Sequence, residues 1–154
     1  MQARFIGTIE AKLDQKGRAF LPAQFRKQLR EAIAGDALTL VLRKDVFEPC
    51  LVLYTEAEWT ARLDELRGRL SIWSRADQAL FREFVAQVEV LTLDSSGRLL
   101  LPRRYLQMAG IESGVTFVGM DRVIEIWPSP YVARVGVGEG ETFGGMLEER
   151  FAPK

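Results

Sequence analysis

Hydrophobic and polar residues alternate in two stretches that are far apart along the chain. Between residues 9 and 13, Ile, Ala and Leu alternate with Glu and Lys, and residues 88–93 form a β-branched run. A period of two and β-branched residues are typical of strands. Two more apolar stretches follow in each half, at 38–41 and 51–54 and at 115–118 and 123–127. The pattern therefore predicts a mainly β chain with two similar halves.

A short segment occurs twice with a constant offset of 80 positions. Residues 14–22 read DQKGRAFLP and residues 94–102 read DSSGRLLLP, and Phe25 corresponds to Tyr105 at the same offset. The later strands remain in the same order in both halves. Self-similarity at this scale indicates repeated structural units. We therefore interpret the chain as two homologous modules.

Each repeat predicts a turn followed by a short helix. In Asp-x-x-Gly, the aspartate can accept a hydrogen bond from the N–H two residues on, and glycine tolerates a positive φ. Pro22 and Pro102 suit the first turn of a helix, where the missing N–H costs nothing. The helices are expected over 23–30 and 103–108, ended by Gly35 and Gly110.

A helical connector is predicted between the modules. Thr55 and Glu58 have capping-box spacing at the start of a first helix. That helix carries Trp59, Leu63 and Leu66 on one face, and a second helix over 77–86 is expected to turn four apolar side chains inward: Leu80, Phe81, Phe84 and Val85. The expected organisation is module 1 at 4–55, the connector at 56–86, module 2 at 87–133, and a flexible glycine-rich tail at 134–154.

Composition narrows the chemistry. The chain has 21 basic and 21 acidic residues among 154, no histidine and one cysteine, Cys50. Zero net charge excludes nucleic-acid coating by bulk charge, and the missing histidine removes the commonest general base and metal ligand. Without an internal disulfide or a signal-peptide pattern, we expect a soluble cytoplasmic protein. Cys50 is expected to be a buried packing residue.

The charge is unevenly distributed. Residues 1–30 carry a local balance of +5 and residues 31–66 a balance of −5, and both turns present an arginine at the same point, Arg18 and Arg98. A charge run is commonly only a solvated face, but folding does not require arginine at a repeated hairpin tip. The planar guanidinium group suits phosphate oxygens and guanine edges. The repetition thus favours binding to a polyanion.

These segments resemble the MraZ family of bacterial transcriptional regulators, which is built from tandem SpoVT-AbrB modules. The resemblance covers roughly residues 4–133. It is carried by Asp14 through Arg18 with Leu-Pro and Phe-Arg after it, by LYTEAEW at 53–59, by residues 94–102, and by FVG and IEIW at 117–119 and 124–127. It implies α+β modules with an AbrB-like swapped-hairpin barrel, joined as an intrachain pseudo-dimer, and assembly of subunits into a ring-shaped homo-oligomer.

The resemblance also implies a function. The family regulates, typically by repression, the operon for cell division and cell-wall synthesis, and binds short direct repeats in double-stranded DNA upstream of it. The DNA contacts come from the Asp-x-x-x-Arg element and transfer to Asp14, Arg18, Asp94 and Arg98. We expect Lys12 and Lys16 to contact the DNA backbone. Ser96 stands where the first repeat has Lys16, which favours a more structural role for the second module.

Other functions are weighed against this one. No enzyme activity, cofactor, metal or membrane contact is expected, and location in the cytoplasm at the nucleoid would follow from DNA binding. The paired Asp-x-x-Gly turns differ from the shorter Asp-Thr/Ser-Gly of aspartic proteases. Trp59 and Trp127 are better explained by core packing than by base stacking. An oligomeric protein-interaction module or an antitoxin-like partner binder remains the alternative.

Overall fold

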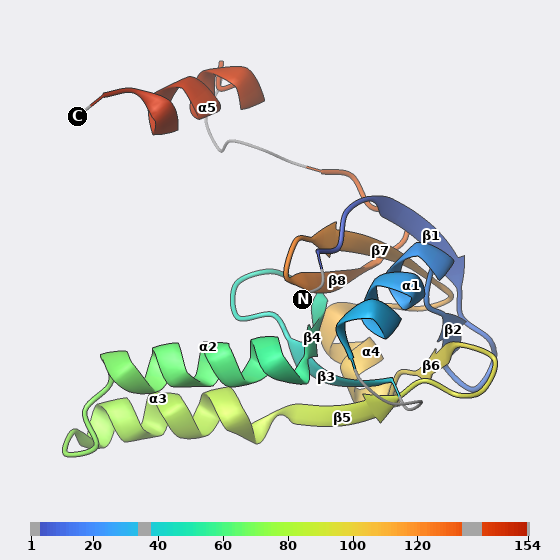
Figure 1. Cartoon of the computed structure of the whole chain (residues 1–154), viewed down its shortest axis with the longest axis horizontal. Helices are drawn as coiled ribbons and strands as arrows, with labels where there is room; N and C mark the ends of the chain where they lie inside the picture. The colour runs from blue at the N-terminus through green and yellow to red at the C-terminus, as the bar shows by residue number, and fades with distance from the viewer. Residues whose placement is uncertain (1–3, 34–37, 134–139, 154) are drawn as a thin grey trace.

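The two repeats form the same series of elements. The structure, a computed structural model, describes residues 4–33, 38–133 and 140–153. The first series is β1 (Thr8–Lys12), β2 (Arg18–Phe20), α1 (Ala23–Ala32), β3 (Thr39–Lys44) and β4 (Leu51–Thr55). The second is β5 (Val88–Thr92), β6 (Arg98–Leu100), α4 (Arg103–Ala109), β7 (Gly114–Met120) and β8 (Val123–Pro128). Helices α2 (Glu56–Arg69) and α3 (Arg75–Ala86) lie between the series, and α5 (Phe143–Phe151) follows them (Figure 1).

Each module gives its first strands to the other. The large sheet has the order β1-β7-β8-β4-β3-β5, so β1 pairs with β7 of the second module and β5 pairs with β3 of the first. Strands β2 and β6 form a separate two-stranded ribbon. This exchange confirms the predicted fold class, two tandem modules in a mainly β pseudo-dimer with short helices. The barrel differs from expectation: β1 and β5 end the sheet, so the described strands leave it open.

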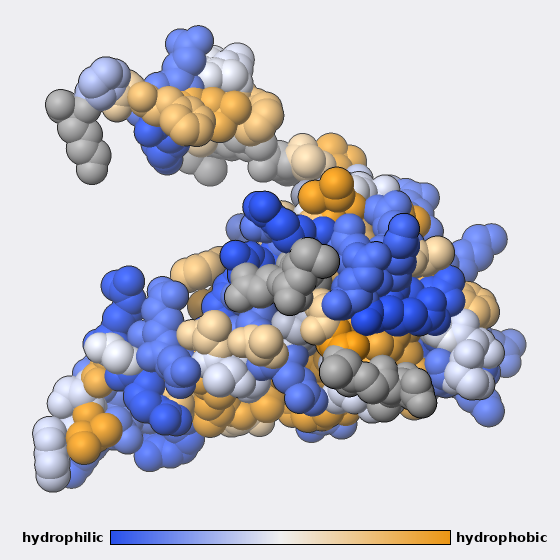
Figure 2. Space-filling model, in the orientation of Figure 1, coloured by the Kyte–Doolittle hydropathy of each residue, from blue (hydrophilic) through white to orange (hydrophobic). Residues whose placement is uncertain are grey.

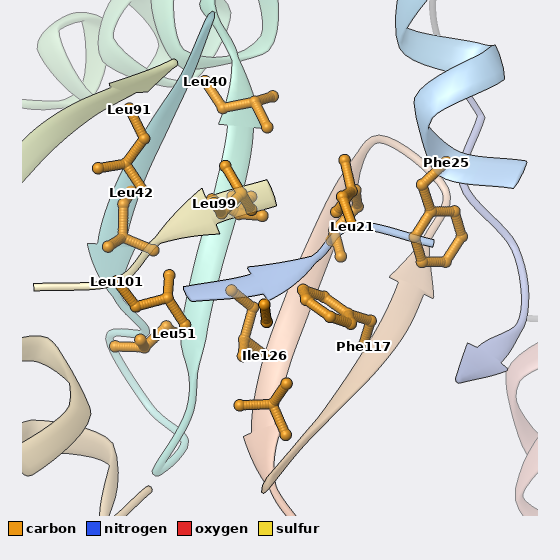
Figure 3. Packing of buried hydrophobic residues seen from close by; sticks show 14 of the residues in the cluster. Leu21, Phe25, Leu40, Leu42, Leu51, Leu91, Leu99, Leu101, Phe117 and Ile126 are labelled. Carbon is orange, nitrogen blue, oxygen red and sulfur yellow. The ribbon is translucent and has the colours of Figure 1, made fainter. Parts of the chain in front are cut away.

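The hydrophobic core fills the space between the ribbon and the large sheet. Leu21 and Leu101, which correspond in the repeat, are both fully buried, as are Phe25 on α1 and Tyr105 on α4. Figure 3 shows Leu21 near the sheet residue Phe117, and Leu99 and Leu101 near the sheet residues Leu42 and Leu51. Each fully buried large apolar side chain contributes about 1.5–3 kcal/mol of transfer free energy. The ribbon is thus anchored from its inner face, which leaves the outer face available.

The predicted helix starts are confirmed. Pro22 and Pro102 are the N-cap residues of α1 and α4. Helix α4 ends at Gly110, which has φ +68°, and its N–H donates to the carbonyl groups of Leu106 and Gln107. Helix α1 ends at Ala32, two residues later than predicted, with Ile33 as its C-cap. The stop predicted at Gly35 lies outside the described residues.

The connector is a helical hairpin that extends from one end of the large sheet (Figure 1). The Thr55 hydroxyl accepts from the Glu58 N–H at 3.1 Å, which confirms the capping interaction. Trp59 stacks on Phe84 with ring centroids 5.2 Å apart, so its predicted packing role is confirmed. The inward orientation predicted for Leu80 is wrong: this side chain is 60% exposed. Only part of the apolar face of α3 is covered by the hairpin.

The C-terminal segment contains a helix that the sequence analysis did not predict. Helix α5 follows Thr142, whose hydroxyl accepts from the Gly145 N–H at 3.0 Å. Residues 134–139 and 154 of the tail lie outside the described residues, and flexibility of the tail stays a prediction. No described helix has both the length and the apolar character needed to span a membrane.

Candidate nucleic-acid interface

The first turn is built around the carboxylate of Asp14. Its Oδ1 accepts from the N–H groups of Lys16 and Arg18, at 2.9 and 2.8 Å. The Gly17 N–H donates to the Asp14 carbonyl oxygen at 3.0 Å, and Gly17 has φ +87°, which favours glycine. The aspartate-centred turn predicted from the sequence is therefore confirmed, and its shape is set by residues within four positions of one another.

The same carboxylate orients the arginine. Arg18 Nε donates to Asp14 Oδ2 at 2.7 Å. The N–H of Arg18 and then its guanidinium group hold the pKa of Asp14 below its usual range, so the carboxylate is charged at neutral pH. The terminal Nη groups of Arg18 form no hydrogen bond with the residues that the structure describes, and the side chain is 30% exposed. They are free to donate to an external acceptor.

The second turn repeats this geometry. Asp94 Oδ1 accepts from the N–H groups of Ser96 and Arg98 at 2.9 Å each, and Oδ2 accepts from Arg98 Nε at 2.8 Å. Gly97 also has φ +87°. The N–H of Arg98 and its guanidinium group lower the pKa of Asp94. Two equivalent turns therefore each present an arginine that is already held in place.

The β2–β6 ribbon brings the two arginines to one surface. Arg18 is paired with Leu100 and Phe20 with Arg98, and these four side chains alternate with the buried Ala19 and Leu99. Reciprocal hydrogen bonds extend the ribbon into the turns, from the Leu21 N–H to the Gly97 carbonyl oxygen (3.1 Å) and from the Leu101 N–H to that of Gly17 (2.9 Å). The outer face of the ribbon thus carries two arginines and two exposed apolar side chains. We call this outer face the ribbon face.

The remaining predicted contact residues flank the first turn. Lys12 ends β1 and Lys16 lies within the turn; both are exposed, and neither forms an ion pair with the described residues. Figure 2 shows hydrophilic surface at the edge of the molecule where the β1–β2 and β5–β6 loops lie. The fold therefore brings Lys12, Asp14, Lys16 and Arg18 together around one turn, with Asp94 and Arg98 in the other.

Sequence reasoning missed two features of this region. Phe20 and Leu100 are 56% and 53% exposed although each lies in an apolar triplet, which the burial of alternate strand residues explains. Arg26 on α1 packs against Gly97 of the second turn, and a Cβ atom built on that glycine would lie 2.5 Å from Arg26 Nη1. No local signal in the sequence predicts this contact, because it depends on the exchange of strands between modules.

A cluster with metal-ligand chemistry lies away from the turns. Ligand atoms of Asp45, Cys50 and Glu125 lie within 4.8 Å of one another. Asp45 Oδ2 already accepts from the N–H groups of Phe47 and Glu48, and Cys50 is fully buried, as predicted. Burial, and then the neighbouring carboxylates, raise the pKa of the Cys50 thiol, so it is protonated at neutral pH. The Asp45 carboxylate therefore stabilises the loop that follows it, and the Cys50 thiol packs in the core, so both side chains have structural roles here.

Comparisons with known proteins match almost the whole chain. The family model described as "MraZ protein, putative antitoxin-like" matches residues 4–83 and again 84–131. A protein of Bacteroides fragilis named "Transcriptional regulator MraZ" is 51% identical over 95% of this chain and 90% of its own length. Proteins of the same name from Phocaeicola vulgatus and Bacteroides thetaiotaomicron are 50% and 48% identical over 95% of this chain, and over 92% and 91% of their own lengths.

Proposed function

The chain belongs to the MraZ family, and on this basis we propose that it is a DNA-binding transcriptional regulator that reads double-stranded DNA with its two Asp-x-x-x-Arg turns. The observation that carries the proposal is that two arginines, Arg18 and Arg98, each oriented by an aspartate, lie on the same ribbon face. Relatives that cover nearly all of the chain are named as transcriptional regulators, which supports the same conclusion.

The proposed contacts follow from the donors that each turn leaves free. Arg18 uses Nε on Asp14, so its Nη groups can donate in a bidentate manner to O6 and N7 of guanine. Because the carboxylate already fixes the guanidinium group, less side-chain freedom is lost on binding. Lys12 and Lys16 would bind phosphate oxygens beside the same bases and set the position of the protein on the duplex. Arg98 and Asp94 would repeat the contact.

The finer proposal concerns assembly and target. We infer that subunits associate in a ring and bind tandem direct repeats upstream of the division and cell-wall gene cluster, where they repress transcription. A ring raises the effective concentration of each further turn once one is bound, so weak single contacts give strong overall binding. Binding through several subunits at once would let a chain without net charge bind DNA strongly. The proposed function involves no enzyme activity and no cofactor.

The test is a titration of selected DNA with matched arginine variants. Fragments that bind the purified protein are selected from random duplex DNA, scored for repeats, and titrated by fluorescence anisotropy. Loss of one bidentate arginine contact should cost about 1–3 kcal/mol, or roughly 5- to 150-fold in affinity, in Arg18→Ala and in Arg98→Ala. Arg62→Ala is the control, since Arg62 is 45% exposed and paired with Glu58 on α2, far along the chain from both turns. Unchanged affinity in both turn variants, with the oligomer intact, refutes the proposal.

A second candidate function is protein binding through the helical hairpin. Ile72 and Trp73 at its tip are 67% and 90% exposed, and Leu80 is 60% exposed. DNA binding by the turns leaves these apolar side chains without a role. Co-purification of a stoichiometric protein partner, lost in Trp73→Ala, together with no retardation of DNA would favour an oligomeric interaction module or an antitoxin-like binder.

A further inference from the structure

Arg26 belongs to the first module but lies against the turn of the second. A Cβ atom built on Gly97 would lie 2.5 Å from Arg26 Nη1 and 2.8 Å from Cδ, so the arginine occupies the space that the glycine leaves open. The first turn of α1 holds it there: its N–H donates to the Pro22 carbonyl oxygen at 3.0 Å, and the adjacent Phe25 is fully buried. The ribbon pairing, which also links Leu21 to Gly97, makes the contact possible.

The guanidinium group of Arg26 lacks an acidic partner. Within residues 4–33, 38–133 and 140–153 it forms no ion pair, and its Nε is buried without a hydrogen bond. Arg18 and Arg98, by contrast, each donate Nε to an aspartate. A buried donor without a partner destabilises the folded state, because it has lost its hydrogen bond to water. The stability of the fold therefore does not explain an arginine here, whereas an anion approaching from solvent would compensate its charge.

The corresponding position in the other repeat is apolar. At the offset of 80, Arg26 corresponds to Leu106, and Leu106 Cδ1 would lie 3.5 Å from a Cβ atom built on Gly17. The first turn is thus backed by a leucine and contains Lys16. The second turn is backed by an arginine and contains Ser96. Each turn therefore has a cation at a position where the other repeat has an uncharged residue: Lys16 within the first turn and Arg26 behind the second.

We propose that Arg26 is a phosphate-binding residue of the second turn, supplied by the other module in place of the lysine that the turn lacks. The inference rests on the proposed function and deepens it, because it gives the second turn a phosphate contact beside the base contact proposed for Arg98. It replaces the expectation, based on Ser96, that the second module has a more structural role than the first. A guanidinium group that contacts phosphate oxygens binds all sequences alike and releases condensed counterions.

The experiment measures the salt dependence of DNA binding by the full chain. Two duplexes are titrated between about 50 and 200 mM salt, one selected by the protein from random DNA and one of unrelated sequence. Loss of one phosphate contact lowers the slope of log K against log salt by about 0.9, which changes the ratio of affinities across this range about 3.5-fold. Arg26→Leu, which copies Leu106, should show this loss on both duplexes. Arg26→Lys should keep the slope, and Lys16→Ser, which copies Ser96, should lose as much as Arg26→Leu.

A double-variant comparison assigns the contact to one turn. Arg26→Leu should have its full effect in an Arg18→Ala background and little further effect in Arg98→Ala, because only the latter weakens the second turn. An unchanged slope in Arg26→Leu, with Arg18→Ala still weakened, overturns the inference and leaves the proposed function standing. If Arg18→Ala and Arg98→Ala also bind normally, the proposed function itself fails. If thermal melting shows that Arg26→Leu folds poorly, Arg26→Gln replaces it. This variant keeps a polar side chain without the charge, and the same loss of salt slope is expected.

Discussion

Arg43 offers a direct test of how the helical hairpin is attached to the sheet. It is a buried charged residue of β3, only 8% exposed. Its Nε donates to the Phe84 carbonyl oxygen at 2.9 Å and Nη2 to that of Glu83 at 3.4 Å, while Nη1 donates to the Lys44 carbonyl oxygen. The carbonyl groups of Glu83 and Phe84 lie at the C-terminal end of α3, where a helix lacks intrahelical partners and favours positive charge.

Replacement of Arg43 by methionine should destabilise the protein by about 2–4 kcal/mol. Hydrogen bonds to a charged group contribute about 1.5–3 kcal/mol each. The variant loses three bonds, of which one is long, and water can reach part of the helix end. The guanidinium group also lies 4.8 Å from the centroid of the Phe84 ring, a contact that the variant loses. For a chain of this length the change corresponds to a melting temperature lower by roughly 5–15 °C.

Urea unfolding followed by tryptophan fluorescence measures this change, because Trp59 stacks on Phe84 and reports on the same contact. Arg62→Met is the matched control. Arg62 pairs with Glu58 at 2.6 Å and lies 5.7 Å from the centroid of the Tyr54 ring, but it is 45% exposed. Such a pair contributes less than about 1 kcal/mol. A loss of stability in Arg43→Met no larger than in Arg62→Met would show that the helix end is held by other contacts.

Three further predictions concern the turns and the cysteine. Backbone N–H groups and the adjacent guanidinium hold the pKa of Asp14 and Asp94 below the usual value of about 4, so their stabilising effect should be complete above that pH and be lost as pH falls through the lowered pKa. Urea unfolding between about pH 2 and 6 measures it, and Asp→Asn at both positions should flatten the profile. Gly17→Ala and Gly97→Ala should each lower the free energy of unfolding by about 1–2 kcal/mol, because both glycines have φ +87°. Only Gly97→Ala should also lower the slope of log K against log salt for DNA binding, because the new Cβ atom displaces Arg26 from that turn. The buried thiol of Cys50, whose pKa is raised, should react with a chromogenic disulfide reagent only after unfolding; rapid reaction of the folded protein would contradict its burial.

The features that the sequence predicted well are those decided within a few residues. The turn at Asp14 needs only a carboxylate, two nearby N–H groups and a glycine with positive φ, all within five positions. The helix start at Thr55 likewise depends on one hydroxyl and one N–H three residues on. Such interactions do not depend on the rest of the fold, so a local pattern is sufficient to predict them.

The features that the sequence did not predict depend on tertiary contacts, that is, on which parts of the chain pack against a given side chain. Helical periodicity identifies Leu80 as part of an apolar face, but it does not say how far along α3 that face is packed. The hairpin is fixed near its base, where Phe84 meets Trp59 and Arg43, and Leu80 lies beyond these contacts. Arg26 is a similar case: alignment of the repeats shows an arginine where the other copy has Leu106, but its place beside Gly97 follows from strand exchange.

Pairing of each arginine with an aspartate separates two requirements of DNA recognition. An Asp–Arg pair such as Asp14 with Arg18 has no net charge, so it adds little to the long-range attraction of the duplex, but it fixes the direction in which the free Nη donors point. Under the proposed function, the attraction near the turns then comes from cations that form no ion pair with the described residues, such as Lys12, Lys16 and Arg26. If these cations contact phosphates and the paired arginines contact bases, as proposed, then affinity and sequence preference are carried by different residues at the two turns.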